Sequence, residues 1–155
     1  MSVAFRRESD EEHLEPKFEL PLPAGPNMVT ARGLGLIEAR VAELEAAIAA
    51  EAEEEPRKML QRELRYWSTR RATARVAQPT EEGVAAIGTR VTIRLAGKTR
   101  TIDIVGHDEA DPAADRIAFS APLAKALIGA EVGERADFNG KAEAIEVLAV
   151  EPIPD

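Results

Sequence analysis

The stretch Gln78-Pro79-Thr80-Glu81-Glu82-Gly83 decides how this chain is organised. Before it, apolar residues recur every three or four positions, and after it they recur every second position. The first period is that of a helix and the second that of a strand, and the proline and glycine favour a break between them. The sequence therefore predicts an α+β protein, with a helical region over 29–77, a linker over 78–83 and a sheet domain over 84–155.

The helical region contains two amphipathic runs joined by a very short connection. The apolar residues of the first run, spaced as a heptad seam, are Leu34, Ile37, Val41, Leu44 and Ile48. Thr30 is suited to cap this helix, and Pro56 suits the first turn of a second helix that is expected to end near Arg75. The second seam contains Leu60, Leu64, Trp67 and Ala74. Two such helices predict an antiparallel hairpin, a short coiled coil with an acidic tip made by Glu51, Glu53, Glu54 and Glu55.

The sheet domain is expected to contain two strand hairpins and one short helix. Val91 to Leu95 returns through Thr101 to Val105, and Asn139-Gly140 marks a tight turn between the strands Ala136 to Phe138 and Ala144 to Val150. Pro122 to Ile128 has helical spacing that directs Leu123, Leu127 and Ile128 inward, with Gly129 as the stop signal. The prediction is a small antiparallel sheet with one helix.

Residues 1–28 differ from the rest, because they combine the charged run Glu8 to Glu12 with Pro16, Pro21, Pro23 and Pro26. This composition predicts a disordered acidic and proline-rich tail. Two roles remain open for it. It could be a solubilising leader, or Phe18, Leu20 and Leu22 could bind a partner.

Composition limits the function classes. The net charge of −8 and the pI near 4.9 argue against a broad nucleic-acid-binding face, which needs clustered Lys and Arg. The absence of Cys excludes thiolate metal sites and cysteine nucleophiles. No zinc-protease, phosphate-loop or hydrolase motif is present. We therefore expect a cytoplasmic protein that is not an enzyme, has no cofactor or metal site, does not associate with membranes and acts on a protein partner.

Two stretches of the sheet domain carry a family resemblance. They are Ile104-Val105-Gly106-His107-Asp108-Glu109-Ala110-Asp111-Pro112 and the run from Ser120 to Gly129. They resemble the carboxy-terminal domain of the bacterial GreA/GreB transcript-cleavage factors, where a strand ending in I-V-G leads into a D-E-A-D turn and then an S-P-containing helical segment. The resemblance is strong from Gly83 to Val150 and looser from Met28 to Val76.

The resemblance implies a fold, a partner and a set of contact residues. It implies an FKBP-like sheet domain that docks at the rim of the RNA polymerase secondary channel, while the hairpin enters the channel as an accessory to the enzyme. The polymerase-binding residues carried over are Gly106, Asp108, Glu109, Asp111, Pro122, Leu123, Lys125, Leu127 and Gly129. Such a factor is expected to be a monomer that meets nucleic acid only through the polymerase.

The sequence departs from the family at two places. Ala121 stands where the family has the Ser before its proline. The bend Glu51-Ala52-Glu53-Glu54-Glu55-Pro56 lacks the family's tip motif, and each arm is roughly ten residues shorter, or about 15 Å. A metal ligand must lie within about 2.5 Å of the ion, so the short arm argues against stimulation of transcript cleavage unless docking is deeper.

Three functional hypotheses follow. The first is a polymerase-binding regulator of elongation that inserts a short acidic-tipped hairpin. The second is a Rnk-type or anti-Gre competitor that binds the polymerase without stimulating cleavage. The third is a dimerisation module in which the seam from Leu34 to Ile48 pairs between two chains and no polymerase is involved.

Overall fold

The computed structural model describes residues 19–78 and 81–154. Contacts divide the chain into two compact units. The helical unit contains Ile37–Thr73 with the segment up to Pro26, and the sheet unit contains Asn27–Leu36 together with Ala74–Asp155. The first helix therefore starts in the sheet unit and continues into the helical unit.

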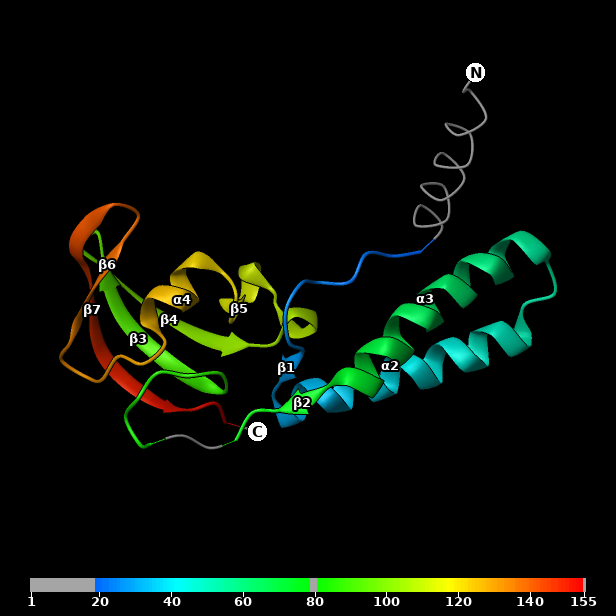
Figure 1. The fold of residues 1–155 in the computed structure, drawn as a ribbon, viewed down its shortest axis with the longest axis horizontal. Helices are drawn as coiled ribbons and strands as arrows, with labels where there is room; N and C mark the ends of the chain where they lie inside the picture. Colours follow the sequence, from blue (N-terminus) through cyan, green and yellow to red (C-terminus); the bar gives the residue numbers. More distant parts are fainter. Residues whose placement is uncertain (1–18, 79–80, 155) are drawn as a thin grey trace, which may run out of the picture. The chain divides into compact units, whose positions relative to one another are not determined.

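Two long helices precede a mixed sheet, which confirms the α+β class (Figure 1). α2 (Ala31–Ala50) and α3 (Glu54–Thr73) are joined by residues 51–53. The seam residues Ile37, Val41 and Leu44 are each only 1% exposed, as the heptad pattern predicts. Arg40 of α2 forms an ion pair of 3.2 Å with Glu63 of α3. α3 begins at Glu54, earlier than predicted, with Pro56 in its first turn.

The described part of the amino-terminal segment contacts α3. Arg65 donates from Nε to the Glu19 carboxylate at 2.5 and 3.1 Å. This hydrogen bond lowers the pKa of Glu19 and raises the pKa of Arg65. Leu20 and Leu22 are 38% and 51% exposed, while Phe18 lies outside the described residues. Glu19 thus lies against α3, although no pattern in the sequence predicted this contact.

The sheet unit contains a five-stranded sheet in the order β5-β4-β3-β7-β6. Its strands are β3 (Thr89–Leu95), β4 (Lys98–Val105), β5 (Arg116–Ala118), β6 (Arg135–Phe138) and β7 (Lys141–Pro152). Every pairing is antiparallel except that of β4 with β5. The predicted all-antiparallel sheet is therefore wrong at this edge. After β4, residues 106–115 bring the chain back along the sheet. β5 then pairs with β4 in the same direction, so the two strands are parallel.

One face of this sheet packs against α4 (Pro122–Leu127). The core contains Val91 and Ile93 from β3, Ile102 and Ile104 from β4, Ile145 and Val147 from β7, Leu123, Ala124 and Leu127 from α4, and Ala85 before β3. The period-two pattern of β3 thus faces this core as predicted. Ile128 is a correction, because it is 41% exposed. The helix ends at Leu127 and Ile128 has non-helical dihedral angles, so its side chain leaves the inward face.

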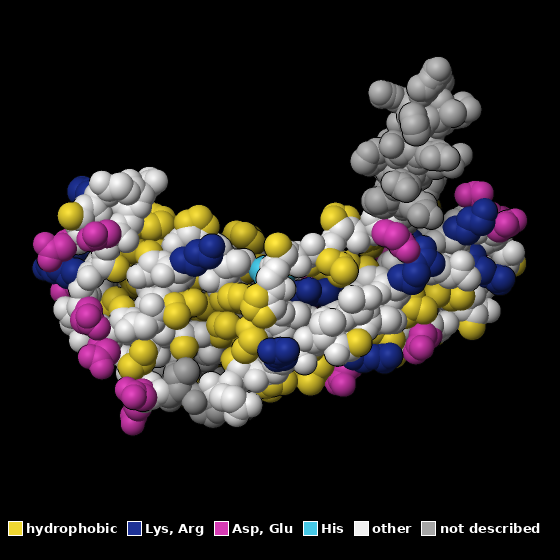
Figure 2. All heavy atoms as spheres, viewed as in Figure 1, with side chains coloured by type: hydrophobic (Ala, Val, Ile, Leu, Met, Phe, Trp, Pro, Cys, Tyr) yellow, Lys and Arg dark blue, Asp and Glu magenta, His cyan; other side chains and the backbone are white. Residues whose placement is uncertain are grey.

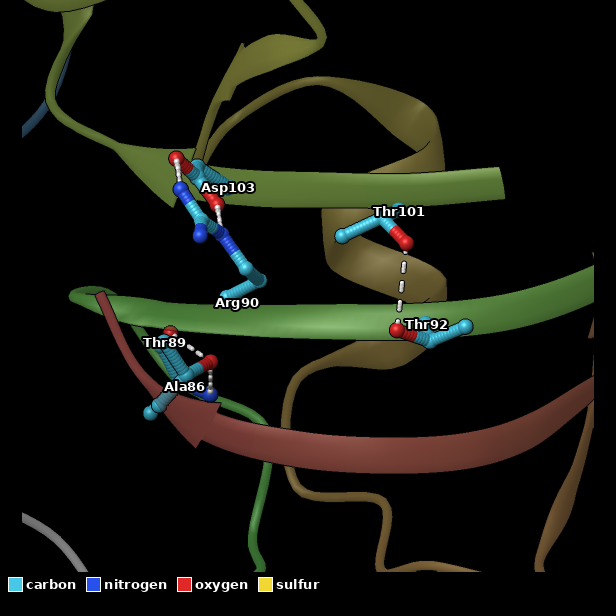
Figure 3. A network of polar contacts seen from close by, with 6 residues as sticks. All are labelled: Ala86, Thr89, Arg90, Thr92, Thr101 and Asp103. Atoms are coloured by element: carbon cyan, nitrogen blue, oxygen red, sulfur yellow. Dashed lines mark hydrogen bonds and ion pairs between the residues drawn. The ribbon is translucent and has the colours of Figure 1, made fainter. Parts of the chain in front are cut away.

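The opposite face of β3 and β4 carries a row of polar pairs (Figure 3). Arg90 donates two hydrogen bonds to Asp103, at 2.8 and 3.1 Å, and Thr92 lies 3.2 Å from Thr101. The bond to Asp103 raises the pKa of Arg90. These cross-strand pairs fix the register of β3 against β4, since a slip of one residue would move them into the apolar core.

Two tight turns close the strand hairpins. Ala96 and Gly97 join β3 to β4 with φ of 53° and 77°. Asn139 and Gly140 join β6 to β7 with φ of 55° and 80°. Two successive positive φ values are the signature of the type I′ turn, which suits Asn-Gly better than Ala-Gly. The predicted turn at Asn139 is therefore confirmed.

A short parallel pair that the sequence did not predict joins β1 (Met28–Val29) to β2 (Arg75–Val76). The Arg75 amide donates to the carbonyl of Asn27, and the Ala77 amide donates to that of Val29. These residues directly precede α2 and follow α3. The two ends of the helical segment are therefore hydrogen-bonded to each other within the sheet unit.

Candidate partner-binding site

The acidic segment forms a compact double turn between β4 and β5. It contains the 3₁₀ turns η1 (His107–Glu109) and η2 (Pro112–Ala114). The Asp111 amide donates to the Arg116 carbonyl at 2.8 Å, and the Arg116 amide returns a bond of 3.1 Å to the Asp111 carbonyl. Hydrogen bonds to the start of β5 therefore fix the backbone of this segment, and the side chains of the segment project from it.

Its three carboxylates face different environments. Asp111 is exposed, Asp108 is half-buried, and Glu109 is only 7% exposed. A three-residue turn places neighbouring side chains about 120° apart, which explains why Asp108 and Glu109 diverge. The carboxylates therefore do not form a uniform acidic patch. Asp111 and Asp108 are accessible to a partner, and the buried position of Glu109 does not fit a direct contact.

The Glu109 carboxylate contacts the start of α2. Thr30 donates from its hydroxyl to Glu109 Oε2 at 2.7 Å, and the Thr30 oxygen accepts the Gly33 amide at 3.0 Å. The second bond confirms Thr30 as the N-cap. Arg32 Nη1 lies 4.0 Å from Glu109 Oε1. All of these residues belong to the sheet unit.

Two glycines allow the close approach of these segments. A Cβ at Gly33 would lie 2.5 Å from Glu109 Oε2 and 2.8 Å from its Cδ. A Cβ at Gly106 would lie 2.5 Å from the Met28 carbonyl oxygen. Gly106 has an ordinary negative φ of −77°, so the missing side chain, and not backbone freedom, explains this glycine.

His107 joins the acidic segment to the loop before α4. Its Nε2 lies 2.8 Å from the Ser120 hydroxyl, and its ring centre lies 4.8 Å from that of Phe119. The two stretches that carry the family resemblance are therefore in contact through His107. We could not have predicted this role from one isolated histidine.

The residues of α4 divide into a core face and an exposed face. Leu127 is fully buried and Leu123 is 9% exposed, so both belong to the core. Pro122 and Lys125 are exposed. Gly129 is also exposed and ends the helical segment with a φ of 94°. The accessible surface beyond the helix includes Ile128 and Val132, which is 52% exposed. Ile128 was predicted to point inward, and no pattern in the sequence marked Val132.

The acidic tip between the helices is partly neutralised. Lys58 Nζ lies 3.5 Å from Glu54 and 3.9 Å from Glu55. The Glu51 side chain accepts the Glu53 amide at 3.2 Å. Figure 2 accordingly shows basic and acidic side chains intermixed at the end where α2 and α3 are connected. The carboxylates of Glu54 and Glu55 thus lie near Lys58, and that of Glu51 accepts a backbone amide.

A cavity of about 440 Å³ borders the buried carboxylate within the sheet unit. Its lining includes Thr30, Arg32, Asp103 and Glu109, with apolar contributions from Ile87 and Val105. The Glu109 side chain therefore forms part of the wall of this cavity.

Within residues 19–78 and 81–154, no three acidic or histidine side chains are grouped so that they could hold a metal ion. No helix in this described part is long and apolar enough to cross a membrane.

Comparison with known proteins identifies relatives of the sheet unit. Residues 79–152 match the family "Transcription elongation factor, GreA/GreB, C-term". Transcription elongation factor GreA of Agrobacterium fabrum is 50% identical over 54 residues, and GreA of Sinorhizobium medicae is 48% identical over 54 residues. Each match covers 34% of this chain and 34% of the relative, so it spans about a third of the relative's length.

Solved structures similar to this chain carry related names. GreA factor homolog 1 of Thermus thermophilus is 14% identical, with a TM-score of 0.38, over 82% of this chain and 99% of that one. The GreA/GreB factor of Nitrosomonas europaea is 17% identical, with a TM-score of 0.39, over 82% of this chain and 98% of that one.

Proposed function

We propose that this protein binds bacterial RNA polymerase and regulates elongation, because residues 79–152 match the GreA/GreB family of transcription elongation factors. The observation that carries the proposal is this match over the sheet unit. In this account the protein is a cytoplasmic accessory factor, and any hydrolysis of the transcript is performed by the polymerase.

The docking surface that we propose combines the exposed part of the acidic turn with the exposed face of α4. Its members are Asp108, Asp111, Pro122, Lys125, Gly129 and Ile128. Two carboxylates beside apolar groups suit a partner surface that offers Lys or Arg around an apolar patch. Leu123 and Leu127 support this surface from the core and do not contact the partner.

We further propose that α2 and α3 form a short antiparallel coiled coil that enters the secondary channel. The buried seam and the pair of Arg40 with Glu63 support the coiled coil. The FKBP-like arrangement of the sheet unit is part of the same proposal.

The length of the helices favours a competitor over a cleavage factor. Each helix has 20 residues, which at 1.5 Å per residue gives about 30 Å. The resemblance implies arms about 15 Å longer. The pairing of Glu54 and Glu55 with Lys58 also reduces the negative charge that the tip could offer to a metal ion.

A transcript-cleavage assay tests this function. Backtracked polymerase complexes are given a limiting amount of an authentic Gre factor, and this protein is added in excess. A competitor lowers the rate of cleavage. A higher rate would mean that Glu51 to Glu55 reach the catalytic metal, and an unchanged rate would contradict binding at the secondary channel.

A further inference from the structure

We propose that Glu109 is a positioning residue that holds the first turn of α2 on the sheet unit, rather than a residue that contacts the partner. The inference rests on the proposed function only where it concerns polymerase binding. Its structural part concerns residues that all lie within the sheet unit.

The first argument is the direction of the hydrogen bonds. A threonine hydroxyl has one proton and two lone pairs. Because Thr30 gives its proton to Glu109 at 2.7 Å, its lone pairs are left to accept the Gly33 amide at 3.0 Å. Glu109 therefore acts on Gly33 through Thr30. Hydrogen bonds in such a chain polarise and strengthen one another.

The second argument is charge. The amino-terminal end of a helix favours a nearby negative charge. α3 supplies its own with Glu54 and Glu55, whereas α2 has no acidic residue in its first turn. Glu109 brings a carboxylate to that end from 79 residues away in the sequence. The negative charge at the start of α2 thus comes from the acidic turn, whereas α3 has acidic residues in its own first turn.

The third argument is packing. The carboxylate fits only because residue 33 has no Cβ, and the acidic turn meets the chain before Thr30 only because residue 106 has none. One short turn therefore exposes Asp111 on its surface and holds the start of α2 with Glu109. A partner that binds this turn also binds next to the attachment point of α2.

Amide hydrogen exchange tests the structural part in the full chain. Glu109→Ala is expected to speed exchange of the Gly33 amide about tenfold, as loss of one such bond allows. Thr30→Val removes the acceptor itself and should speed exchange at least as much, and the double variant should be no faster than Thr30→Val alone. Glu38→Ala, which removes an exposed carboxylate from α2, is the control and should leave this amide unchanged. Unchanged exchange at Gly33 in Glu109→Ala would overturn the proposal.

Polymerase binding separates positioning from direct contact. If Glu109 positions α2, then Glu109→Ala and Thr30→Val should weaken binding by a similar factor, about three- to tenfold, and the double variant should not be weaker still. If Glu109 touches the polymerase, Glu109→Ala weakens binding and Thr30→Val does not, which would overturn the proposal. Failure of the unmodified protein to bind would contradict the proposed function, while the exchange result would still decide the role of Glu109.

Discussion

Thr30 and Glu109 lie 79 residues apart in the sequence and are joined by a hydrogen bond of 2.7 Å. This bond connects the N-cap of α2 to the acidic turn between β4 and β5. The acidic turn consists of two short 3₁₀ turns, and α2 has no acidic residue in its first turn. The contact therefore supplies the first turn of α2 with a carboxylate that its own sequence lacks, and it attaches the acidic turn to the start of that helix.

Gly33 and Gly35 provide a matched pair of substitutions in the first turns of α2. Gly35→Ala meets nothing within 4 Å and should stabilise the fold by about 0.5–1 kcal/mol, because Ala favours a helix over Gly. Gly33→Ala must displace the Glu109 carboxylate. It should lose a charged hydrogen bond worth about 1.5–3 kcal/mol, against a helix gain of about 1 kcal/mol.

The net expectation for Gly33→Ala is a loss of about 0.5–2 kcal/mol in the free energy of unfolding, measured by urea denaturation. The adjoining cavity of about 440 Å³ gives the displaced carboxylate somewhere to go, so global unfolding is not expected. Adding Glu109→Ala to Gly33→Ala removes the clash and should recover the helix gain. Equal effects of the alanines at 33 and 35 would contradict the close contact.

Ala121 leaves α4 without a side-chain cap. It occupies the N-cap position with extended dihedral angles and makes no side-chain hydrogen bond. Ala121→Ser should stabilise the sheet unit by about 0.5–1 kcal/mol, because a serine hydroxyl there can accept an amide of the first turn. Thermal melting measures the effect. Ala121→Val adds bulk without a hydroxyl and should not stabilise; a gain from both variants would argue against capping.

The turn between β3 and β4 is expected to improve on substitution. Ala96 has a φ of 53°, which is unfavourable for alanine and tolerated by asparagine. Ala96→Asn should therefore raise the free energy of unfolding by about 0.5–1 kcal/mol. The reverse change at the equivalent position of the other hairpin, Asn139→Ala, should lower it by a similar amount. The two substitutions should change the free energy of unfolding in opposite directions. A decrease for both would show that Ala96 makes contacts that outweigh its dihedral strain.

The pKa of Glu19 reports whether the amino-terminal segment lies against α3 in solution. The hydrogen bond from Arg65 lowers this pKa, so the contact stabilises the protein at pH values above the unfolded pKa, and this stabilisation is lost as the pH falls through the folded pKa. Arg65→Gln should move the pKa of Glu19 up towards its ordinary value. An NMR titration of the carboxyl carbon measures the shift, and an identical pKa in both proteins would show that the segment is free of α3.

The sequence was sufficient to predict the features that depend on neighbours in the chain. The heptad spacing identified the buried residues Ile37, Val41 and Leu44. Thr30 was predicted as the cap because a threonine directly before an amphipathic run suits that position, and its bond to the Gly33 amide confirms it. The dipeptide Asn139-Gly140 marked a turn because few other residues adopt its dihedral angles. In each case the residues that determine the feature lie close together in the sequence.

Features that depend on distant segments were not predicted. β5 has only three residues, Arg116 to Ala118, which is too short to show alternation, and its parallel direction follows from the double turn before it. Glu109 and Asp108 were both predicted to bind the partner. A sequence motif gives the residue types but not the directions of their side chains, so it could not distinguish the two. The sequence does contain one indication of this contact. A glycine in the first turn of a helix, here Gly33, is unfavourable for the helix and is consistent with another segment packing closely against it.

Direct binding of this protein to bacterial RNA polymerase core enzyme tests the central claim. We predict that the full chain binds immobilised core enzyme and is displaced by an authentic Gre factor. We further predict that Asp111→Arg, a change at an exposed carboxylate, weakens binding while leaving the melting temperature unchanged, and that adding Asp108→Arg to make the double variant abolishes binding. No binding by the unmodified protein, or full binding by the double variant, would contradict the account.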